Sequence, residues 1–321
     1  MEMIKLHKKG MYFTLMTIAF LIIFVFIFMI PGYKRLGEEM MVIEMRVDSM
    51  NDFIKDLERD TERGLYISSY RALLALEEYV IINGEFLDDT KSSFKEALLN
   101  GTVQGISSSL MMASTFPNWI EKIEGKASRF NIDANITVNN VSVYQDDPWN
   151  VKVSAYLIFS IKDATDIASW DREERTETSI SIMDFEDPLY IVSSFGRTTN
   201  VINKTGFEGN YTYKIGGTWN VTNLLTHLEN SYYAANPDAP SFLMRFENDL
   251  GSSPYGIESF VDLRKLSDYG LEIYDESSVI DYHYWDGDDN GDYRINFTPS
   301  WFKLDAGHLA KYNVTGISYP K

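Results

Sequence analysis

One acidic loop in this chain has the residue types and the spacing of a cation site. Its oxygen-bearing residues fall on alternate positions, at Asp286, Asp288 and Asn290 before Gly291 and at Asp292 after it. Such alternation followed by glycine is typical of the first half of an EF-hand-type calcium loop. The twelfth loop position, normally a bidentate Glu, is Phe297, so the motif is incomplete. Calcium is the one cofactor that the sequence suggests, and the alternative is an exposed acidic hairpin turn between residues 282–285 and 293–295.

Other acidic residues and histidines do not form a recognisable catalytic or zinc motif. Asp184, Glu186 and Asp187 could supply paired carboxylates, but no sequence feature places a partner opposite them. We interpret this cluster as a turn that ends a strand. The four histidines lack the H-x-x-x-H and H-E-x-x-H spacings of zinc sites. The sequence also has no G-x-S-x-G, P-loop or G-x-G-x-x-G motif, so we expect no catalytic residues, with an unrecognised extracytoplasmic hydrolase as the alternative.

The composition excludes several classes of protein. The 321 residues carry 47 acidic and 29 basic side chains, a net charge of −18, so we expect no nucleic-acid partner. The chain has no cysteine, which excludes disulfides, cysteine-ligated metals and a thiol nucleophile. A cysteine-free external domain of this size fits a prokaryotic envelope better than an oxidising eukaryotic compartment.

One segment near the N-terminus can span a membrane. Residues 11–30 contain no charge, proline or glycine, and as a helix they reach about 30 Å, the thickness of a hydrocarbon core. A removable secretory signal usually has an apolar region of about 7–15 residues and a small-x-small cleavage site. Pro31-Gly32-Tyr33-Lys34 follows here instead. We therefore predict a retained single-pass helix in the lipid bilayer.

The flanking residues indicate the orientation of this segment. Lys5, Lys8 and Lys9 precede it and acidic residues soon follow it, which favours a cytoplasmic N-terminus. Eight N-x-S/T sequons lie beyond it, at Asn100, Asn135, Asn140, Asn203, Asn210, Asn220, Asn296 and Asn313. Their number favours an extracytoplasmic, glycosylated body at the cell surface. We expect residues 1–10 to be the cytoplasmic part, too short for a signalling domain.

Apolar residues continue at helical spacing beyond the membrane segment. They recur every three or four positions, as in a heptad stripe, at Leu36, Met40, Ile43, Val47, Met50, Ile54 and Leu57. The stripe packs either on the globular part of its own chain or on a neighbouring helix, and the sequence leaves both interpretations open. Pro31 would bend this helix without ending it. Gly64 is predicted to interrupt it before a second helix over residues 65–82.

The rest of the chain predicts an α+β fold in three regions. Residues 31–130 form a helical region, with helices ending near Asn100 and over 103–114 and 116–128. Residues 131–187 form an antiparallel meander of three alternating strands, over 131–144, 151–161 and 176–185. Residues 188–321 form an α+β C-terminal subdomain with predicted helices over 221–235, 256–269 and 301–312 and predicted strands over 189–194, 211–215, 279–285 and 293–297.

Lys8-Lys9-Gly10 immediately precedes the uncharged stretch, and that stretch continues into an external helix. In this arrangement the chain resembles archaeal type IV pilin-like proteins with a class III signal, over about residues 1–60. In this family a membrane peptidase cuts after such a glycine on the cytoplasmic side, and the apolar helix remains as a filament core or an anchor. The resemblance implies that Gly10 is the last leader residue and that Met11 becomes the N-terminus.

The chain also departs from the family pattern. Bacterial relatives usually carry Glu at the fifth mature position, which is Leu15 here, and many archaeal pilins carry Gln at the first, which is Met11. Most major pilins are much shorter than 321 residues. The resemblance therefore implies a minor, accessory or tip-like protein rather than a bulk subunit.

These features lead to two expectations for function. The first is a non-enzymatic, membrane-anchored cell-surface protein, a pilin-like component of a type IV pilus-related filament or assembly system. The alternative is a signal-anchored extracytoplasmic binding module for a glycan, a peptide or another surface protein. Tyr and Trp residues crowd the C-terminal half and can form contact surfaces, although we expect most of them in the core.

Overall fold

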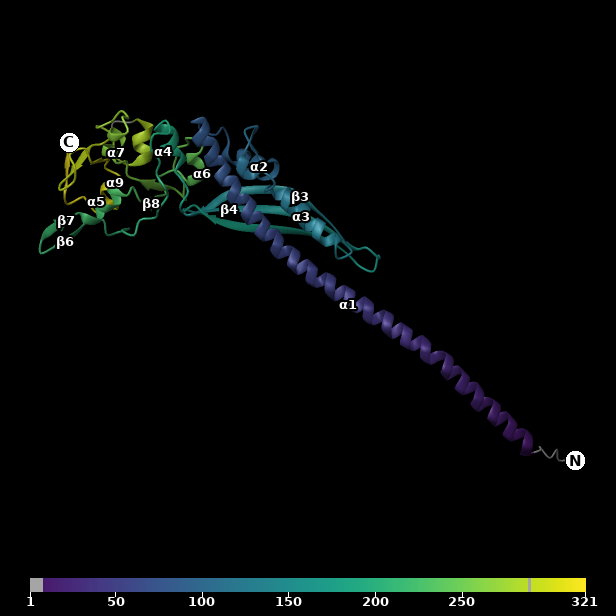
Figure 1. Ribbon diagram of the computed structural model, residues 1–321. Coiled ribbons are helices and arrows are strands. Elements are labelled where there is room, and N and C mark those ends of the chain that lie inside the picture. Colours follow the sequence, from purple (N-terminus) through teal and green to yellow (C-terminus); the bar gives the residue numbers. More distant parts are fainter. Residues whose placement is uncertain (1–7, 288–289) are drawn as a thin grey trace.

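The chain folds as one long helix that carries a head on its C-terminal half. The computed structural model describes residues 8–287 and 290–321, and of residues 8, 9 and 30–39 it describes the backbone alone. Helix α1 (Lys8–Asn83) begins as a stem that projects from the head, and the C-terminus lies at the opposite end of the elongated molecule (Figure 1). Helices and antiparallel sheets make up the head, which confirms the α+β prediction.

Helix α1 passes through Gly64 without a break, so the predicted interruption is wrong. The helix ends only at Asn83. Gly64 faces the indole of Trp119 in helix α3 (Phe116–Ser128), and a Cβ atom at Gly64 would lie 2.1 Å from Trp119 Cδ1. Trp119 Nε1 donates to the carbonyl oxygen of Asp60 at 3.0 Å. A glycine is required here because α1 and α3 lie so close together. The free energy of this packing offsets the low helix propensity of glycine.

Helix α2 (Thr90–Asn100) is capped at both ends. The Asp89 carboxylate accepts from the backbone N–H of Ser92, and Gly101 ends the helix with φ +77°. An aspartate before the first turn and a glycine after the last are the residue types that such positions favour. Helices α2 and α3 both pack against α1.

The predicted antiparallel meander is confirmed. It consists of β3 (Ile132–Asp147), β4 (Asn150–Asp163) and β5 (Ser169–Ser181) in that order. One face of the sheet is covered by helices, with α1 along β5 and β4 and α3 along β3 (Figure 1). The buried apolar side chains of β4 recur at every second position and are Val151, Val153, Ala155, Leu157, Phe159 and Ile161.

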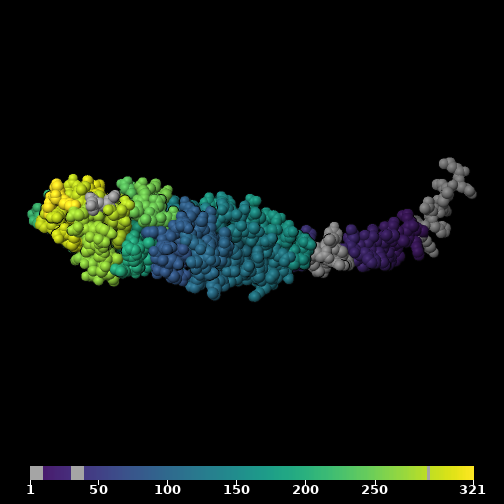
Figure 2. Space-filling model, turned by 90° about the horizontal axis from the view of Figure 1, so that it is seen from above, coloured from purple at the N-terminus to yellow at the C-terminus, as the bar shows by residue number. Residues whose placement is uncertain are grey.

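The C-terminal part is a series of short elements. They are α4 (Pro188–Ser193), β6 (Tyr213–Ile215), β7 (Thr218–Asn220), α5 (Thr222–Glu229), β8 (Tyr233–Ala235), α6 (Phe242–Arg245), β9 (Ile257–Ser259), α7 (Leu263–Asp268), α8 (Asp281–Asp286), β10 (Tyr293–Ile295), β11 (Lys303–Leu304), α9 (His308–Lys311) and β12 (Ser318–Pro320). Phe242 and Phe246 belong to the same apolar core as the meander, whereas Phe260 and Phe302 belong to a second core. The head forms a continuous body, from which the stem emerges at one end (Figure 2).

Three predicted elements in the head are wrong. Residues 103–114 are not a helix, because Gln104 and Gly105 both have positive φ, which is the geometry of a two-residue hairpin turn. The segment forms β1 (Thr102–Val103), β2 (Ile106–Ser107) and the 3-10 helix η1 (Ser109–Met111). Residues 189–194 and 279–285 are not strands. They contribute instead to α4, which Asp187 caps, and to α8.

The three helices predicted in the C-terminal part are shorter than expected. Each predicted range contains a short helix and a strand, and the pairs are α5 with β8, β9 with α7, and β11 with α9. After α5 the chain reverses at Ser231, which has φ +47°, and this reversal prevents the helix from continuing to residue 235. Strands at 213–215 and 293–295 lie within the ranges predicted for them.

Candidate functional site

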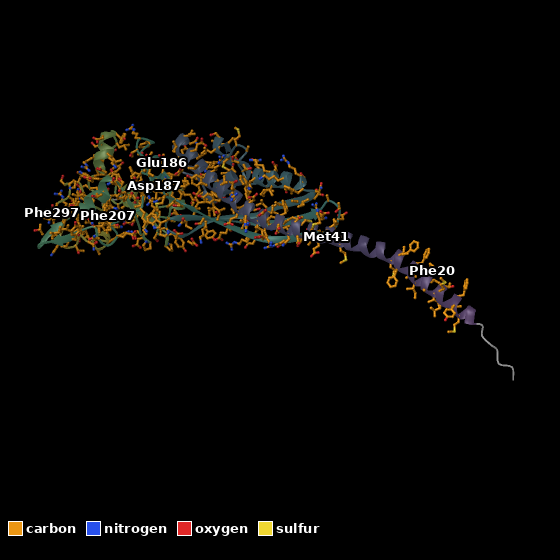
Figure 3. All side chains as sticks on the ribbon, turned by 60° about the horizontal axis from the view of Figure 1, so that its bottom comes forward. Phe20, Met41, Glu186, Asp187, Phe207 and Phe297 are labelled. Atoms are coloured by element: carbon orange, nitrogen blue, oxygen red, sulfur yellow. The ribbon has the colours of Figure 1, made fainter. Side chains whose placement is uncertain are left out.

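The stem of α1 carries the candidate membrane segment. Among the helices that the structure describes, α1 is long and apolar enough to cross a membrane, over Gly10–Met29 with a mean hydropathy of 2.6. None of this segment is buried against the head. Phe20 projects from the stem into open space (Figure 3). An apolar helix without protein contacts needs lipid or other helices around it.

A second exposed apolar surface lies on α1 beyond the membrane segment. It comprises five side chains that are each between 45% and 70% exposed: Met40, Met41, Val42, Ile43 and Met45, hereafter the stem patch. These residues point in all directions around the helix, because they are nearly consecutive in sequence. Figure 3 places Met41 where the stem meets the head. Contiguous exposed apolar surface of this kind marks a contact with a membrane or a protein.

Part of the heptad stripe packs on the head of its own chain, and part of it is exposed. Met50 and Leu57 are buried against the head and Ile54 is half-buried, so this half packs on its own chain. Met40 and Ile43 remain exposed and contribute to the stem patch, and Val47 is half-buried. The side chain of Leu36 lies outside the described residues.

Arg46 marks the boundary between the stem and the head. Its guanidinium pairs with Asp163 at the end of β4 and donates to the carbonyl oxygens of Phe130 and Asn131 at 3.0 and 2.9 Å. Hydrogen bonds from the Thr165 hydroxyl and from Arg46 lower the pKa of Asp163 to about 2. The far end of the meander is thereby fixed to α1 just after the stem patch.

The residues predicted for processing and glycosylation lie largely on the surface. Gly10 and Met11 are exposed at the start of α1, and no side chain packs on Gly10. Leader residues 1–7 lie outside the described residues. Of the sequon asparagines, Asn220 and Asn313 are half-buried and the others are exposed. An enzyme could reach the exposed asparagines, and their modification stays a prediction.

The proposed calcium loop has a different local structure from either sequence interpretation. Residues 281–286 form helix α8, so the hairpin-turn alternative is wrong. Asp286 and Asp292 are exposed, and Asp288 lies outside the described residues. Asn290 Oδ1 accepts from the backbone N–H of Ser278 at 3.0 Å, and its Nδ2 lies 3.0 Å from His283 Nδ1. Calcium binding by this loop stays a prediction.

The acidic cluster at residues 184–187 is divided between the surface and the interior: Asp184 is exposed in the turn that follows β5, and Glu186 is half-buried. Asp187 is completely buried and lies within the head (Figure 3). Its Oδ2 accepts from the guanidinium of Arg245 at 2.5 Å and from the hydroxyl of Tyr233 at 2.7 Å. Arg245 also pairs with Asp281 at 2.9 Å, and burial raises the pKa of Asp281 to about 6. We interpret these groups as a structural ion network, because all three charged side chains are inaccessible.

A second polar network, which sequence reasoning missed, surrounds His308. Its Nδ1 lies 2.7 Å from Asp305 Oδ2 and its Nε2 lies 3.1 Å from the buried carboxylate of Glu258. Burial alone would lower the pKa of His308, but hydrogen bonds to Asp305 and Glu258 raise it to about 9. His283 lies beside this pair, with Nε2 4.0 Å from Asp305 Oδ2, and burial lowers its pKa. Two imidazoles and a carboxylate of this kind can bind a metal ion.

The sequence contained only a weak signal of this cluster. Asp305 and His308 are three positions apart, which places them together at the start of a helix, but His283 comes from a separate element. His283 and His308 are 25 positions apart, so the cluster does not have the H-x-x-x-H spacing of a helical zinc motif. A comparison with protein-family models, with curated proteins and with solved structures found no match for this chain.

Proposed function

We propose that this chain is a pilin-like minor or accessory subunit of a type IV pilus-related filament or assembly system. In this account the membrane holds α1 in a single pass with the N-terminus in the cytoplasm, and the head lies outside. The stem packs against the corresponding helices of other subunits. The protein acts by assembly rather than by catalysis, and glycans on the exposed sequons cover the head.

The observation that carries this proposal is the extent of exposed apolar surface along α1. The stem patch lies 11–16 residues beyond Met29, which is about 16–24 Å along the helix. The headgroup layer adds only about 5–8 Å on each side of the hydrocarbon core. A plain anchor therefore has no need for apolar side chains on all sides at this distance. A bundle of stems would cover them.

The alternative, a binding module on a plain anchor, has less support. Several of the aromatic residues that suggested a contact surface are buried in the core, including Tyr211, Tyr233 and Tyr284, and Trp219 and Trp301 pack against it. The exposed apolar surface is concentrated on the stem and not on the C-terminal part.

N-terminal sequencing and intact mass of the protein from its native membrane test the processing step. We expect Met11 at the N-terminus, and we expect Gly10→Val to retain residues 1–10. Gly125→Ala is the matched control, because Gly125 is a helical glycine with no neighbour within 4 Å of its Cβ position. An N-terminus at Met1 or Glu2 in the unaltered protein would contradict class III processing and favour the signal-anchored binding module.

A further inference from the structure

His283, Asp305 and His308 converge from three places in the C-terminal part. His283 lies in α8, Asp305 precedes α9, and His308 begins α9. One ligand atom from each side chain lies within 4.8 Å of the other two. Ligands at about 2.0–2.2 Å from a tetrahedral zinc ion lie about 3.3 Å apart, so the cluster needs movements of only about 1–1.5 Å to close around an ion.

We propose that these three side chains form a divalent transition-metal site of the zinc class. The ligands are Nε2 of His283, a carboxylate oxygen of Asp305 and Nδ1 of His308. Two nitrogens and one oxygen suit zinc and disfavour calcium and magnesium, which prefer oxygen ligands. The remaining coordination positions are open to water or to a group from another molecule.

The groups that contact His308 are of the kind that hold a histidine ligand in place in a metal site. With Nδ1 on the ion, Nε2–H donates to Glu258, whose Oε2 lies 3.1 Å away. Glu258 is fully buried and is itself held by the Tyr312 hydroxyl and the Lys311 ammonium, each at 2.7 Å. A carboxylate behind a histidine fixes the ring orientation and makes the ligating nitrogen a better donor.

Hydrogen bonds also orient the carboxylate of Asp305. Its Oδ1 accepts from the backbone N–H of Gly307 at 3.0 Å, and its Oδ2 accepts from the hydroxyl of Ser278 at 3.0 Å. These bonds hold the carboxylate toward the two imidazoles without a cation in place. Side-chain exposure is 30% for His283, 15% for Asp305 and 7% for His308, so an ion can enter from the His283 side.

The site differs from the acidic loop that the sequence singled out. That loop offers only oxygens, and its Asn290 lies beside the metal site, with Nδ2 3.0 Å from His283 Nδ1 while Oδ1 accepts from the Ser278 N–H. Ligation through Nε2 requires the proton of His283 to be on Nδ1, so the Asn290 amide must then present its oxygen to this ring.

Calorimetric titration of the full chain in detergent with zinc chloride, after treatment with a chelator, tests the proposal. We expect one equivalent of zinc to bind, and we expect His283→Ala and Asp305→Asn to weaken binding at least about tenfold. The matched control is Asp286→Asn, which removes an exposed carboxylate at the end of α8 and leaves the three proposed ligands in place, so it should leave zinc affinity unchanged. Thermal unfolding of each metal-free variant shows whether it is folded.

A cobalt titration adds a readout of the ligands. Cobalt bound by two imidazoles and a carboxylate gives visible absorption that should disappear in His283→Ala. Zinc binding that is unchanged in both His283→Ala and Asp305→Asn, or no stoichiometric binding by the unaltered chain, would overturn the proposal. His308 would then be part of an ion network with Asp305 and Glu258 alone.

Discussion

Arg46 and Asp163 form an ion pair between residues 117 positions apart in the chain, and this pair lies where α1 leaves the head. Immediately before it, the side chains of the stem patch are exposed, and after it Met50 and Leu57 are buried. The pair fixes the end of the meander to the helix just beyond the stem patch. The packing of α1 on the head therefore begins where the stem patch ends.

The contact between Gly64 and Trp119 predicts an unusual result for a helix substitution. Gly64→Ala should destabilise the head by about 1–3 kcal/mol, because the added methyl group overlaps the indole. Gly125→Ala should stabilise it by up to about 1 kcal/mol, since its methyl group meets nothing and alanine favours the helix. Urea unfolding of both variants measures the difference. Stabilisation by both substitutions would show that Trp119 does not pack on Gly64.

The buried network around Arg245 predicts a large loss of stability when the arginine is replaced. Arg245→Met leaves Asp187 and Asp281 buried without a cation, and we expect a cost of about 3–5 kcal/mol. Arg264→Met is the matched control, because Arg264 pairs with Asp262 at 3.0 Å but is 53% exposed. That change should cost no more than about 1 kcal/mol. Equal losses of unfolding free energy in the two variants, measured by chemical denaturation, would contradict the role of Arg245 as the cation of a buried network.

Glu77 on α1 should make the stability of the folded chain depend on pH. Burial raises the pKa of its carboxyl to about 8, while its Oε1 accepts from the backbone N–H of Glu186 at 2.7 Å. The unfolded chain loses this proton near pH 4.5 and the folded chain near pH 8, so stability should fall as pH rises between these values.

Glu77→Gln should remove this dependence and give a protein more stable than the unaltered one above pH 8. Glu62→Gln, at an exposed position on the same helix, should leave the dependence unchanged. Thermal unfolding between pH 5 and pH 9 distinguishes the two variants. If the stability of Glu77→Gln still falls as pH rises, another group must cause the dependence.

One substitution should increase the affinity of the proposed site for zinc. Asn290 can satisfy either the Ser278 N–H or a proton on His283 Nδ1 with its single oxygen, whereas aspartate offers an oxygen to each. Asn290→Asp should therefore tighten zinc binding by about tenfold or more. Asn210→Asp adds the same charge at an exposed position and should have no such effect. Weaker or unchanged zinc affinity in Asn290→Asp would argue against Nε2 of His283 as a ligand.

Local signals in the sequence predicted α2 and the meander. The caps Asp89 and Gly101 act within one helical turn, and the strands of the meander alternate regularly, so α2 and the sheet did not depend on distant contacts. The prediction at Gly64 was wrong because a glycine is needed there for the contact with Trp119, which is distant in the sequence.

The C-terminal part and its polar clusters could not be derived in this way. Its elements are short apolar runs that suit a helix or a strand, and neighbouring segments decide between them. The partners in the clusters are also remote in sequence, as Asp187 and Arg245 are 58 positions apart. The spacing of charged residues along the chain therefore carried little information about which of them meet.

The most direct test of the account places a photoreactive side chain at Met41 and activates it in the native membrane. We expect covalent adducts with a second copy or with the apolar N-terminal helix of another pilin-like subunit, identified by mass spectrometry. The same group at Met112, which is 78% exposed on the head, is the control and should not give these adducts. Adducts with lipid alone, or none, would contradict the claim that the stem patch is an assembly surface.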